Sequence, residues 1–330
     1  MIKGIYVLNT EAYHKIYGSA ERHEIERLVH IYAPQQTKES VKANRSILAE
    51  ADVIFSGWGM PVMDEDFLAA APSLKCVFYG AGSTREIMTE SFWGHGIVIT
   101  SAYAANAVPV AEYALSQILF CLKRGWHYTL SIKRERRYPP SEPAPGAYGS
   151  IVGVISLGMV GRHLIQLLQQ FEVKTIAHDP YVTSDDAVRL HVELCSLEDL
   201  FRRSDVVSLH APLLKETEGM ITGAHFASMK PNASFINTAR GAIVREQEMV
   251  QILRQRPDLQ VVLDVTHPEP PDPSSPLYAL PNVVLTPHIA GSTDRECLRM
   301  GRFMVDELRR YVAGEPLRWA ISQEKSVILA

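Results

Sequence analysis

The sequence predicts an α/β protein with parallel sheets and two domains. Short apolar runs alternate with helix-length segments from one end of the chain to the other, which is typical of parallel α/β proteins. The length of 330 residues predicts two domains, at about 150 residues for each. In the second half, polar groups follow the apolar runs, as expected where ligands bind at the carboxyl ends of parallel strands.

The composition is that of a folded globular protein and excludes several classes of function. Hydrophobic residues make up 46% of the chain and charged residues 21%. The net charge of −4 predicts no surface for nucleic acid. The 4 cysteines form no CxxC pair and the 12 histidines show no zinc spacing, so we expect no metal. Free thiols fit the cytoplasm.

Neither a secretory leader nor a membrane span is expected. Residues 1–13 alternate like a strand and lack the long apolar core of a signal peptide. The most apolar long stretch, residues 102–122, contains Asn106, Pro109 and Glu112, which favours a buried helix.

The first half carries five apolar runs that predict strands, and the loop YPPSEPAPGAYGS at 138–150 separates it from the second half. The predicted strands of the first half are residues 5–8, 29–31, 53–55, 76–79 and 97–99.

The second half carries six apolar runs, and a polar group follows each of them. The runs are residues 151–155, 173–177, 206–209, 234–236, 261–263 and 283–285. The groups that follow them are Ser156-Leu-Gly158, Asp179, His210-Ala-Pro212, Thr238-Ala-Arg240, Asp264 and Pro287-His288. Because parallel strands end at one edge of their sheet, we expect these groups to share one ligand-binding edge.

The segment SLGMVG at 156–161 predicts a dinucleotide-binding turn. It lies between a buried strand and an apolar-periodic helix at 162–171, and its Gly158 and Gly161 occupy the last two glycine positions of GxGxxG. The helix N-terminus would offer N–H groups to a pyrophosphate. Ser156 stands where the first glycine is expected, which narrows the conformations available to the turn.

Asp179 predicts a preference for NAD over NADP. It follows the second strand about 20 residues after the turn, where a carboxylate accepts hydrogen bonds from the adenosine ribose and repels a 2′-phosphate. The alternative is a structural role for Asp179 as a helix cap before Pro180.

Several segments together resemble the D-isomer-specific 2-hydroxyacid dehydrogenase family, which includes glyoxylate and hydroxypyruvate reductases and phosphoglycerate dehydrogenases. The resemblance spans nearly the whole chain. The segments are YGAGST (79–84), ANAVPVAEYAL (105–115), SLHAPLLKETEGMI (208–221), NTARGAIV (237–244), LDVTHPEPP (263–271) and TPHIAGST (286–293). SGWGMP (56–61) lacks the Arg that phosphoglycerate-type members carry thereabouts.

The resemblance implies a catalytic triad of Arg240, Glu269 and His288. His288 would donate the proton to the carbonyl oxygen of a 2-keto acid, and Glu269 would favour the imidazolium and orient the ring. Arg240 would bind the substrate carboxylate and carbonyl with its rigid donors.

The resemblance also implies which residues contact substrate and NAD. With Arg240 and His288, the substrate contacts would be Gly80, Ala81 and Gly82, and Asp264 would orient the nicotinamide amide. The full set of implied NAD contacts is Gly158, Met159, Val160, Asp179, His210, Ala211, Pro212, Thr217, Thr238, Ala239, Arg240, Asp264, His288 and Gly291.

The family pattern implies two Rossmann-like domains between which the chain crosses twice. Residues 1–104 and 298–330 would form a flavodoxin-like substrate domain, and residues 105–297 a doubly wound NAD-binding domain. A helix at 106–123 would support a homodimer, and the partners would be small 2-keto or 2-hydroxy acids, with no nucleic acid and no membrane.

Two other functions fit the same fold. A dinucleotide-sensing, corepressor-like binding protein could keep the triad, and turnover with keto acids would distinguish it from an enzyme. Formate or phosphite oxidation is disfavoured, because formate enzymes of the family have Gln where this chain has Glu269.

Overall fold

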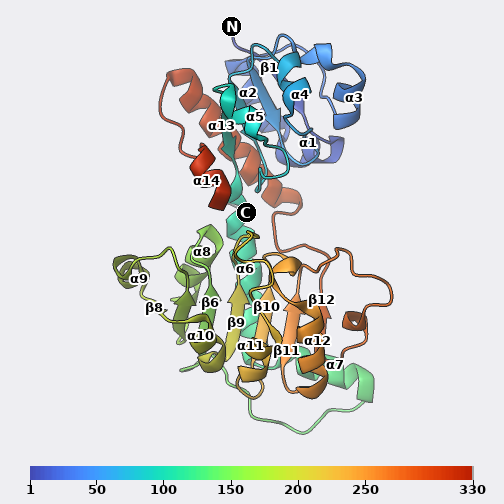
Figure 1. The fold of residues 1–330 in the computed structure, drawn as a ribbon, viewed down its shortest axis with the longest axis vertical. Coiled ribbons are helices and arrows are strands. Elements are labelled where there is room, and N and C mark those ends of the chain that lie inside the picture. Colours follow the sequence, from blue (N-terminus) through green and yellow to red (C-terminus); the bar gives the residue numbers. More distant parts are fainter. Residues whose placement is uncertain (329–330) are drawn as a thin grey trace. The chain divides into compact units, whose positions relative to one another are not determined.

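The computed structural model describes residues 1–328 and divides the chain into two compact units (Figure 1). Unit 1 comprises Met1–Asn106 and Ser292–Ala330, and unit 2 comprises Ala107–Gly291. The sequence places the two boundaries after residues 104 and 297. The chain therefore passes from unit 1 into unit 2 and back again.

Unit 1 contains a sheet of five strands in the order β2-β1-β3-β4-β5, and all neighbouring pairs are parallel. This is the flavodoxin-like order, which confirms the predicted fold of this part. The strands are β1 (Lys3–Val7), β2 (His30–Ile31), β3 (Val53–Ser56), β4 (Cys76–Tyr79) and β5 (Val98–Ser101).

Helices cover both faces of this sheet, and an apolar cluster lies between the sheet and the helices on each face. On one face Ile16, Ile25 and Met304 pack against Phe55 and Phe78. The helices of unit 1 are α1 (Thr10–Ile16), α2 (Ser19–Leu28), α3 (Lys38–Ala43), α4 (Glu65–Ala70), α5 (Glu90–Gly94), α13 (Cys297–Ala313) and α14 (Gln323–Ile328), with the 3-10 turns η1 (Arg45–Leu48) and η4 (Asp294–Glu296).

Unit 2 contains a seven-stranded sheet in the order β12-β11-β10-β9-β6-β7-β8, again with parallel neighbours. The order reverses between β6 and β9, as in a doubly wound dinucleotide fold, which confirms the predicted class. The strands are β6 (Ile151–Ile155), β7 (Lys174–His178), β8 (Glu193–Leu194), β9 (Val206–Leu209), β10 (Ser234–Asn237), β11 (Gln260–Leu263) and β12 (Val283–Leu285).

Helices cover both faces of this second sheet. One apolar cluster joins α10, α11 and α12 to it through Phe201, Phe226 and Met249, and the other joins α6 and α8 through Ile118 and Leu164. The helices are α6 (Tyr103–Leu122), which begins in unit 1, α7 (Gly125–Glu135), α8 (Met159–Leu168), α9 (Ser184–Leu190), α10 (Leu197–Arg203), α11 (Gly223–Ser228) and α12 (Glu246–Gln255), with the 3-10 turns η2 (Gly241–Ile243) and η3 (Pro276–Tyr278).

Among the described residues, α6 alone is long and apolar enough to cross a membrane by length and composition. Ala111, Ala114 and Ile118 on this helix are fully buried and pack into the core of unit 2. The predicted helix is confirmed, and one of its faces lies in the core, with 44% of its most apolar window buried.

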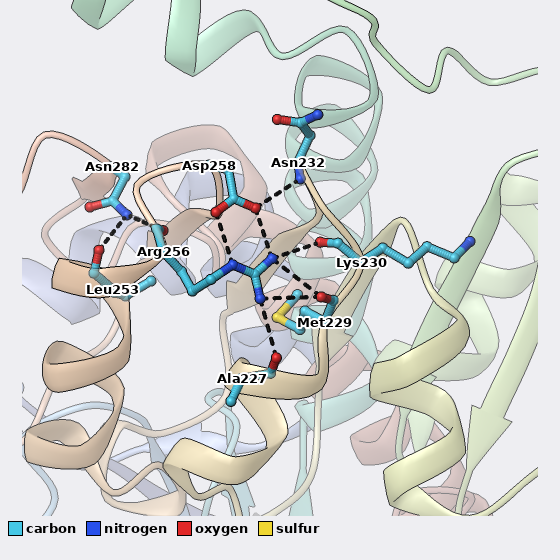
Figure 2. A network of polar contacts seen from close by, with 8 residues as sticks. All are labelled: Ala227, Met229, Lys230, Asn232, Leu253, Arg256, Asp258 and Asn282. Atoms are coloured by element: carbon cyan, nitrogen blue, oxygen red, sulfur yellow. Dashed lines mark hydrogen bonds and ion pairs between the residues drawn. The ribbon is translucent and has the colours of Figure 1, made fainter.

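At the edge where β10 and β11 begin, Arg256 joins several backbone segments of unit 2 (Figure 2). Its guanidinium donates to the Asp258 carboxylate at 2.9 and 2.7 Å. It also donates to the carbonyls of Ala227, Met229 and Lys230, which lie at the end of α11 and beyond it. One half-buried side chain thus satisfies the carbonyls of Ala227 and Met229 at the helix end. The third carbonyl, that of Lys230, also accepts the Ala233 N–H.

Replacing Arg256 should destabilise unit 2 without any change near the strand ends that carry the site. Arg256→Met removes the guanidinium from Asp258 and leaves the carbonyls of Ala227 and Met229 without their side-chain donor, so we expect the free energy of unfolding to fall by about 1–3 kcal/mol. Arg254→Met is the matched control, because Arg254 is exposed in the last turn of α12, two residues before Arg256, and should change stability by less than about 0.5 kcal/mol. Equal losses in urea-induced unfolding would contradict this role.

Candidate active site

The strands β10, β11 and β12 bring the predicted triad to one edge of the sheet of unit 2. These strands are neighbours, and each ends directly before a segment that carries one triad residue. The backbone continues the pairing beyond the strands, since the Asp264 N–H donates to the Asn237 carbonyl and the Thr286 N–H donates to the Leu263 carbonyl, both at 3.0 Å. The three segments therefore leave the sheet side by side.

His288 and Glu269 are in direct contact. Nδ1 of the imidazole lies 2.6 Å from Oε1 of the carboxylate, and the two side chains are 47% and 41% exposed. This contact leaves Nε2, the other ring nitrogen, for exchange of a proton with a substrate. The carboxylate fixes the orientation of the ring, so the pair has the geometry of a general acid–base catalyst.

The backbone of His288 is held in a left-handed conformation, with φ of 53°. Its N–H donates to the Asp264 carbonyl at 2.9 Å. The buried Asp264 carboxylate accepts the N–H groups of the next two residues, Ile289 at 2.9 Å and Ala290 at 2.8 Å. Asp264 therefore fixes the segment on which the imidazole stands.

The Arg240 segment packs closely against the beginning of the Glu269 segment. A Cβ added to Gly241 would lie 2.0 Å from the Thr266 carbonyl carbon, so only glycine allows this approach. The Asn237 side chain donates to the Arg240 carbonyl at 3.0 Å and holds the turn after β10. The Arg240 guanidinium donates to the carbonyl of Ala239 through Nη1 at 2.6 Å.

The turn after β6 has the geometry of a phosphate-binding site. Gly158 precedes the first residue of α8 and gives the helix no side-chain cap, and a Cβ on it would meet no atom within 4 Å. A Cβ on Gly161 would lie 2.1 Å from the Ser156 carbonyl oxygen, so glycine is required for helix and strand to pack. The open N-terminus of α8 fits the pyrophosphate of NAD.

Asp179 closes this turn from the end of β7. Its Oδ2 accepts the Leu157 N–H at 2.6 Å and lies 3.4 Å from the Ser156 hydroxyl, while its Oδ1 accepts the Tyr181 N–H at 2.8 Å. A carboxylate can accept about four hydrogen bonds, so Asp179 retains capacity for a ribose hydroxyl. Ser156 itself has φ of 74°, the conformation that explains the usual glycine here.

His210 follows β9 and is held between two hydroxyl groups. Its Nε2 lies 2.9 Å from the Ser208 hydroxyl, and its Nδ1 lies 3.2 Å from the Thr238 hydroxyl. Removal of the ring from bulk water lowers the pKa of His210 to about 3, so the ring is neutral at pH 7. The hydroxyl of Thr217 accepts the Leu214 N–H at 2.8 Å and shapes the neighbouring loop.

The predicted substrate contacts Gly80, Ala81 and Gly82 belong to unit 1, where they follow β4. The Ser101 hydroxyl lies 2.9 Å from the Ala81 carbonyl and 2.5 Å from the Gly82 carbonyl, which orients this loop. Within residues 1–328, the N–H groups of Ala81 and Gly82 have no protein acceptor. Ala81 is fully buried, whereas Gly82 is partly exposed, so the Gly82 N–H is the more accessible of the two to an anionic ligand.

One further side chain, Thr286, contacts the Asp264 carboxylate, and Tyr113 is linked to the carboxylate through Thr286. The sequence predicts no role for either residue. The Thr286 hydroxyl lies 2.6 Å from Asp264 Oδ1, and the Tyr113 hydroxyl lies 2.8 Å from that of Thr286. Thr286 directly follows β12, like the other strand-end groups, so its position was a usable signal. Tyr113 lies inside an apolar helix and carries no such signal.

Residues 115–290 match the model of the D-isomer-specific 2-hydroxyacid dehydrogenase NAD-binding domain. The chain is 31% identical over 260 residues to D-3-phosphoglycerate dehydrogenase of Archaeoglobus fulgidus, covering 79% of this chain but 49% of that protein. It is 34% identical over 250 residues to (S)-sulfolactate dehydrogenase of Chromohalobacter salexigens, covering 75% of this chain and 81% of that protein. The chain thus spans about half the length of the phosphoglycerate dehydrogenase.

A solved structure of D-2-hydroxyisocaproate dehydrogenase is similar to nearly the whole chain. The TM-score is 0.78 at 25% identity, with 97% of this chain and 99% of that chain covered. The similarity includes both units, whereas the family model matches only residues of unit 2.

The left-handed backbone at Ser156 predicts that glycine is better tolerated there than alanine. Both substitutions remove the contact with Asp179, but alanine keeps the steric cost of a positive φ. We expect Ser156→Gly to be more stable than Ser156→Ala by about 1 kcal/mol. Gln247 is exposed inside α12, so there the alanine variant should be more stable than the glycine variant. The same order at both positions in denaturant unfolding would be inconsistent with a strained Ser156.

The neutral His210 ring predicts a loss of stability in acid. The unfolded chain binds a proton on this residue below pH 6.5, whereas the folded protein resists protonation down to a pKa of about 3. Stability should fall as the pH is lowered across this window, by up to about 1.4 kcal/mol per pH unit. Unfolding free energies of His210→Asn measured across the same window should fall less steeply. Parallel curves for the two proteins would contradict this assignment.

Proposed function

The chain belongs to the D-isomer-specific 2-hydroxyacid dehydrogenase family, and we propose that it transfers a hydride between NAD(H) and a small 2-keto or D-2-hydroxy acid. The observation that supports this most strongly is the 2.6 Å contact between His288 and Glu269. Both residues follow strands that lie next to β10, the strand that precedes Arg240. An acid–base pair and a cation are the groups that reduction of a 2-keto acid requires from a protein.

In the proposed reaction, His288 exchanges the proton. Bound NADH would supply the hydride for C2 of the keto acid. Protonated His288 gives its proton to the carbonyl oxygen, which becomes the hydroxyl group. Glu269 stabilises the imidazolium before this transfer and keeps Nδ1 occupied, so that Nε2 faces the reaction. In the oxidation direction the neutral ring takes the proton back from the hydroxyl group.

Arg240 is the proposed partner of the substrate carboxylate and carbonyl. Its guanidinium is permanently charged, and its planar donors suit two acceptors at once. The bond from Nη1 to the Ala239 carbonyl uses one donor and leaves the others for the substrate. The N–H groups of Ala81 and Gly82 are proposed as further partners of the substrate carboxylate.

NAD is the cofactor of this family's domain, and its proposed contacts lie along the carboxyl edge of unit 2. The N-terminus of α8 would bind the pyrophosphate, Asp179 the ribose, and Asp264 the nicotinamide amide. Of the remaining predicted contacts, His210 and Thr238 are hydrogen-bonded to each other at this edge of the sheet. We further propose that the protein is cytoplasmic and forms a homodimer. Light scattering of the purified protein tests the dimer.

The test of this function is steady-state turnover with NADH and a panel of 2-keto acids. Glyoxylate, hydroxypyruvate, pyruvate, phenylpyruvate and branched keto acids cover the range of side-chain sizes, and phosphohydroxypyruvate adds a phosphorylated member. Turnover of at least one of them supports the proposal. A folded protein that binds NADH but reduces none of them would favour a dinucleotide-sensing function.

Variants of the acid–base pair should separate its two members. His288→Ala should lower the rate by about 10²–10⁴-fold, which is the usual contribution of general acid–base catalysis. Glu269→Gln keeps the hydrogen bond but removes the charge, so reduction should lose activity at lower pH than in the wild type, and oxidation should persist to lower pH. Reductase activity that survives His288→Ala unchanged would overturn the proposed role.

The Asp179 carboxylate should determine cofactor preference. Asp179→Ala removes the ribose acceptor and the charge that repels a 2′-phosphate, so we expect the difference in binding free energy between NADH and NADPH to shrink by about 1–3 kcal/mol. Fluorescence titration of both cofactors measures this difference. Asp185→Ala, at an exposed position on α9, is the control. A wild type that binds NADPH as tightly as NADH would refute the assignment.

A further inference from the structure

Three side chains of unit 2 form a continuous hydrogen-bond chain that ends at Asp264. Tyr113 lies on α6, Thr286 directly follows β12, and Asp264 directly follows β11. The two hydroxyl oxygens are 2.8 Å apart, and the Thr286 hydroxyl lies 2.6 Å from Oδ1 of Asp264. These hydrogen bonds therefore join a helix to the ends of β11 and β12, the two strands that precede Glu269 and His288.

The chemistry of the three groups gives the chain one direction. An ionised carboxylate only accepts hydrogen bonds, so the single proton of the Thr286 hydroxyl must point to Asp264. The contact between the two hydroxyls then requires Tyr113 to donate to Thr286. Burial raises the pKa of Tyr113, so its phenol keeps this proton at neutral pH.

This arrangement saturates one oxygen of the carboxylate and orients the other. Oδ1 of Asp264 accepts from the Thr286 hydroxyl and from the Ile289 N–H, which uses both of its lone pairs. Oδ2 accepts from the Ala290 N–H and keeps one lone pair. The carboxylate is thus fixed in the orientation that holds the backbone on the carboxyl side of His288.

Tyr113 is itself held rigidly. Its neighbours Ala111 and Ala114 are fully buried and pack into the same core as the central strands of the sheet. The phenol is half-buried, and its hydroxyl has only Thr286 as partner among the described residues. The packed helix α6 therefore provides the outer end of this hydrogen-bond chain, and its inner end is the carboxylate that holds the His288 segment.

We propose that Tyr113 is a positioning residue for the reaction: its hydroxyl orients Asp264 through Thr286 and thereby holds His288 against Glu269. The inference rests on the proposed function of His288 as proton donor. Tyr113 touches neither substrate nor the reacting atoms in this account. It acts only through the geometry of the His288 segment.

The first test is a double-mutant cycle on the rate of keto-acid reduction. Tyr113→Phe removes one hydroxyl at constant shape and should lower kcat by about three- to tenfold, with a smaller change in KM. Thr286→Val should lower kcat at least as much, and Thr286→Ser should restore it. Because Tyr113 acts through Thr286, the double variant Tyr113→Phe with Thr286→Val should be no slower than Thr286→Val alone.

The matched control is Tyr128→Phe on α7. The Tyr128 hydroxyl also makes hydrogen bonds, to the backbone of Glu142, but Tyr128 is not part of the proposed site. Its loss should leave kcat unchanged even if stability falls. An equal loss of kcat in both Tyr→Phe variants, or effects of Tyr113 and Thr286 that multiply in the double variant, would overturn the proposal.

The second test does not require turnover. Diethyl pyrocarbonate modifies neutral imidazole, and His288 is accessible because its side chain is 47% exposed. Peptide mapping across pH then gives the midpoint at which this one ring loses its proton. The carboxylates that face its segment are Glu269, which contacts the ring, and Asp264, which holds the backbone. Tyr113→Phe should move the midpoint to lower pH, in the direction of Glu269→Gln.

The two tests fail in distinguishable ways. If no keto acid is reduced, the proposed function fails, while the modification midpoint still decides whether Tyr113 positions His288. If the wild type reduces keto acids and Tyr113→Phe changes neither kcat nor the midpoint, the proposed function stands and the positioning role is wrong. A purely structural role for Tyr113 would lower stability and leave the midpoint unchanged.

Discussion

The buried carboxylate of Asp264 is the interaction on which the rest of the site depends. It accepts the Thr286 hydroxyl and the N–H groups of Ile289 and Ala290, so both sides of His288 are bound to one group at the end of β11. A buried carboxylate without these donors would be costly, and the left-handed His288 backbone would lose the hydrogen bonds that hold its carboxyl side. The same three hydrogen bonds therefore satisfy the charge and place the imidazole.

The remaining geometry follows from parallel strands that end together and from backbones that approach closely. β10, β11 and β12 deliver their polar segments to one edge, and Gly241 lets the segment after β10 lie against Thr266. At the other side of the sheet, Gly161 serves the same purpose between β6 and α8. Ser156 has the backbone of a glycine, and its hydroxyl lies 3.4 Å from Asp179.

Most of the fold and the order of the strand-end groups could be predicted from the sequence, because buried parallel strands are apolar runs and ligands bind where they end. β4, β6, β9 and β12 have the predicted bounds, and β8 was missed because its two residues, Glu193 and Leu194, form no apolar run. Tyr113 could not be predicted, since an aromatic residue in an apolar helix indicates only a core position. Its hydroxyl gains a role through a contact 173 residues away in the sequence. The contacts of the substrate and NAD stay predictions.

In the proposed reaction, the groups at this edge of the sheet direct a hydride to one face of a 2-keto acid. The most direct measurement is a reduction with NADH in which both hydrogens at C4 of the nicotinamide are deuterium, followed by mass spectrometry and chiral chromatography of the product. We expect a D-2-hydroxy acid that carries deuterium on C2. Product without deuterium on C2 would contradict direct hydride transfer, and an L-2-hydroxy acid would contradict the proposed arrangement of His288 and Arg240 around the substrate.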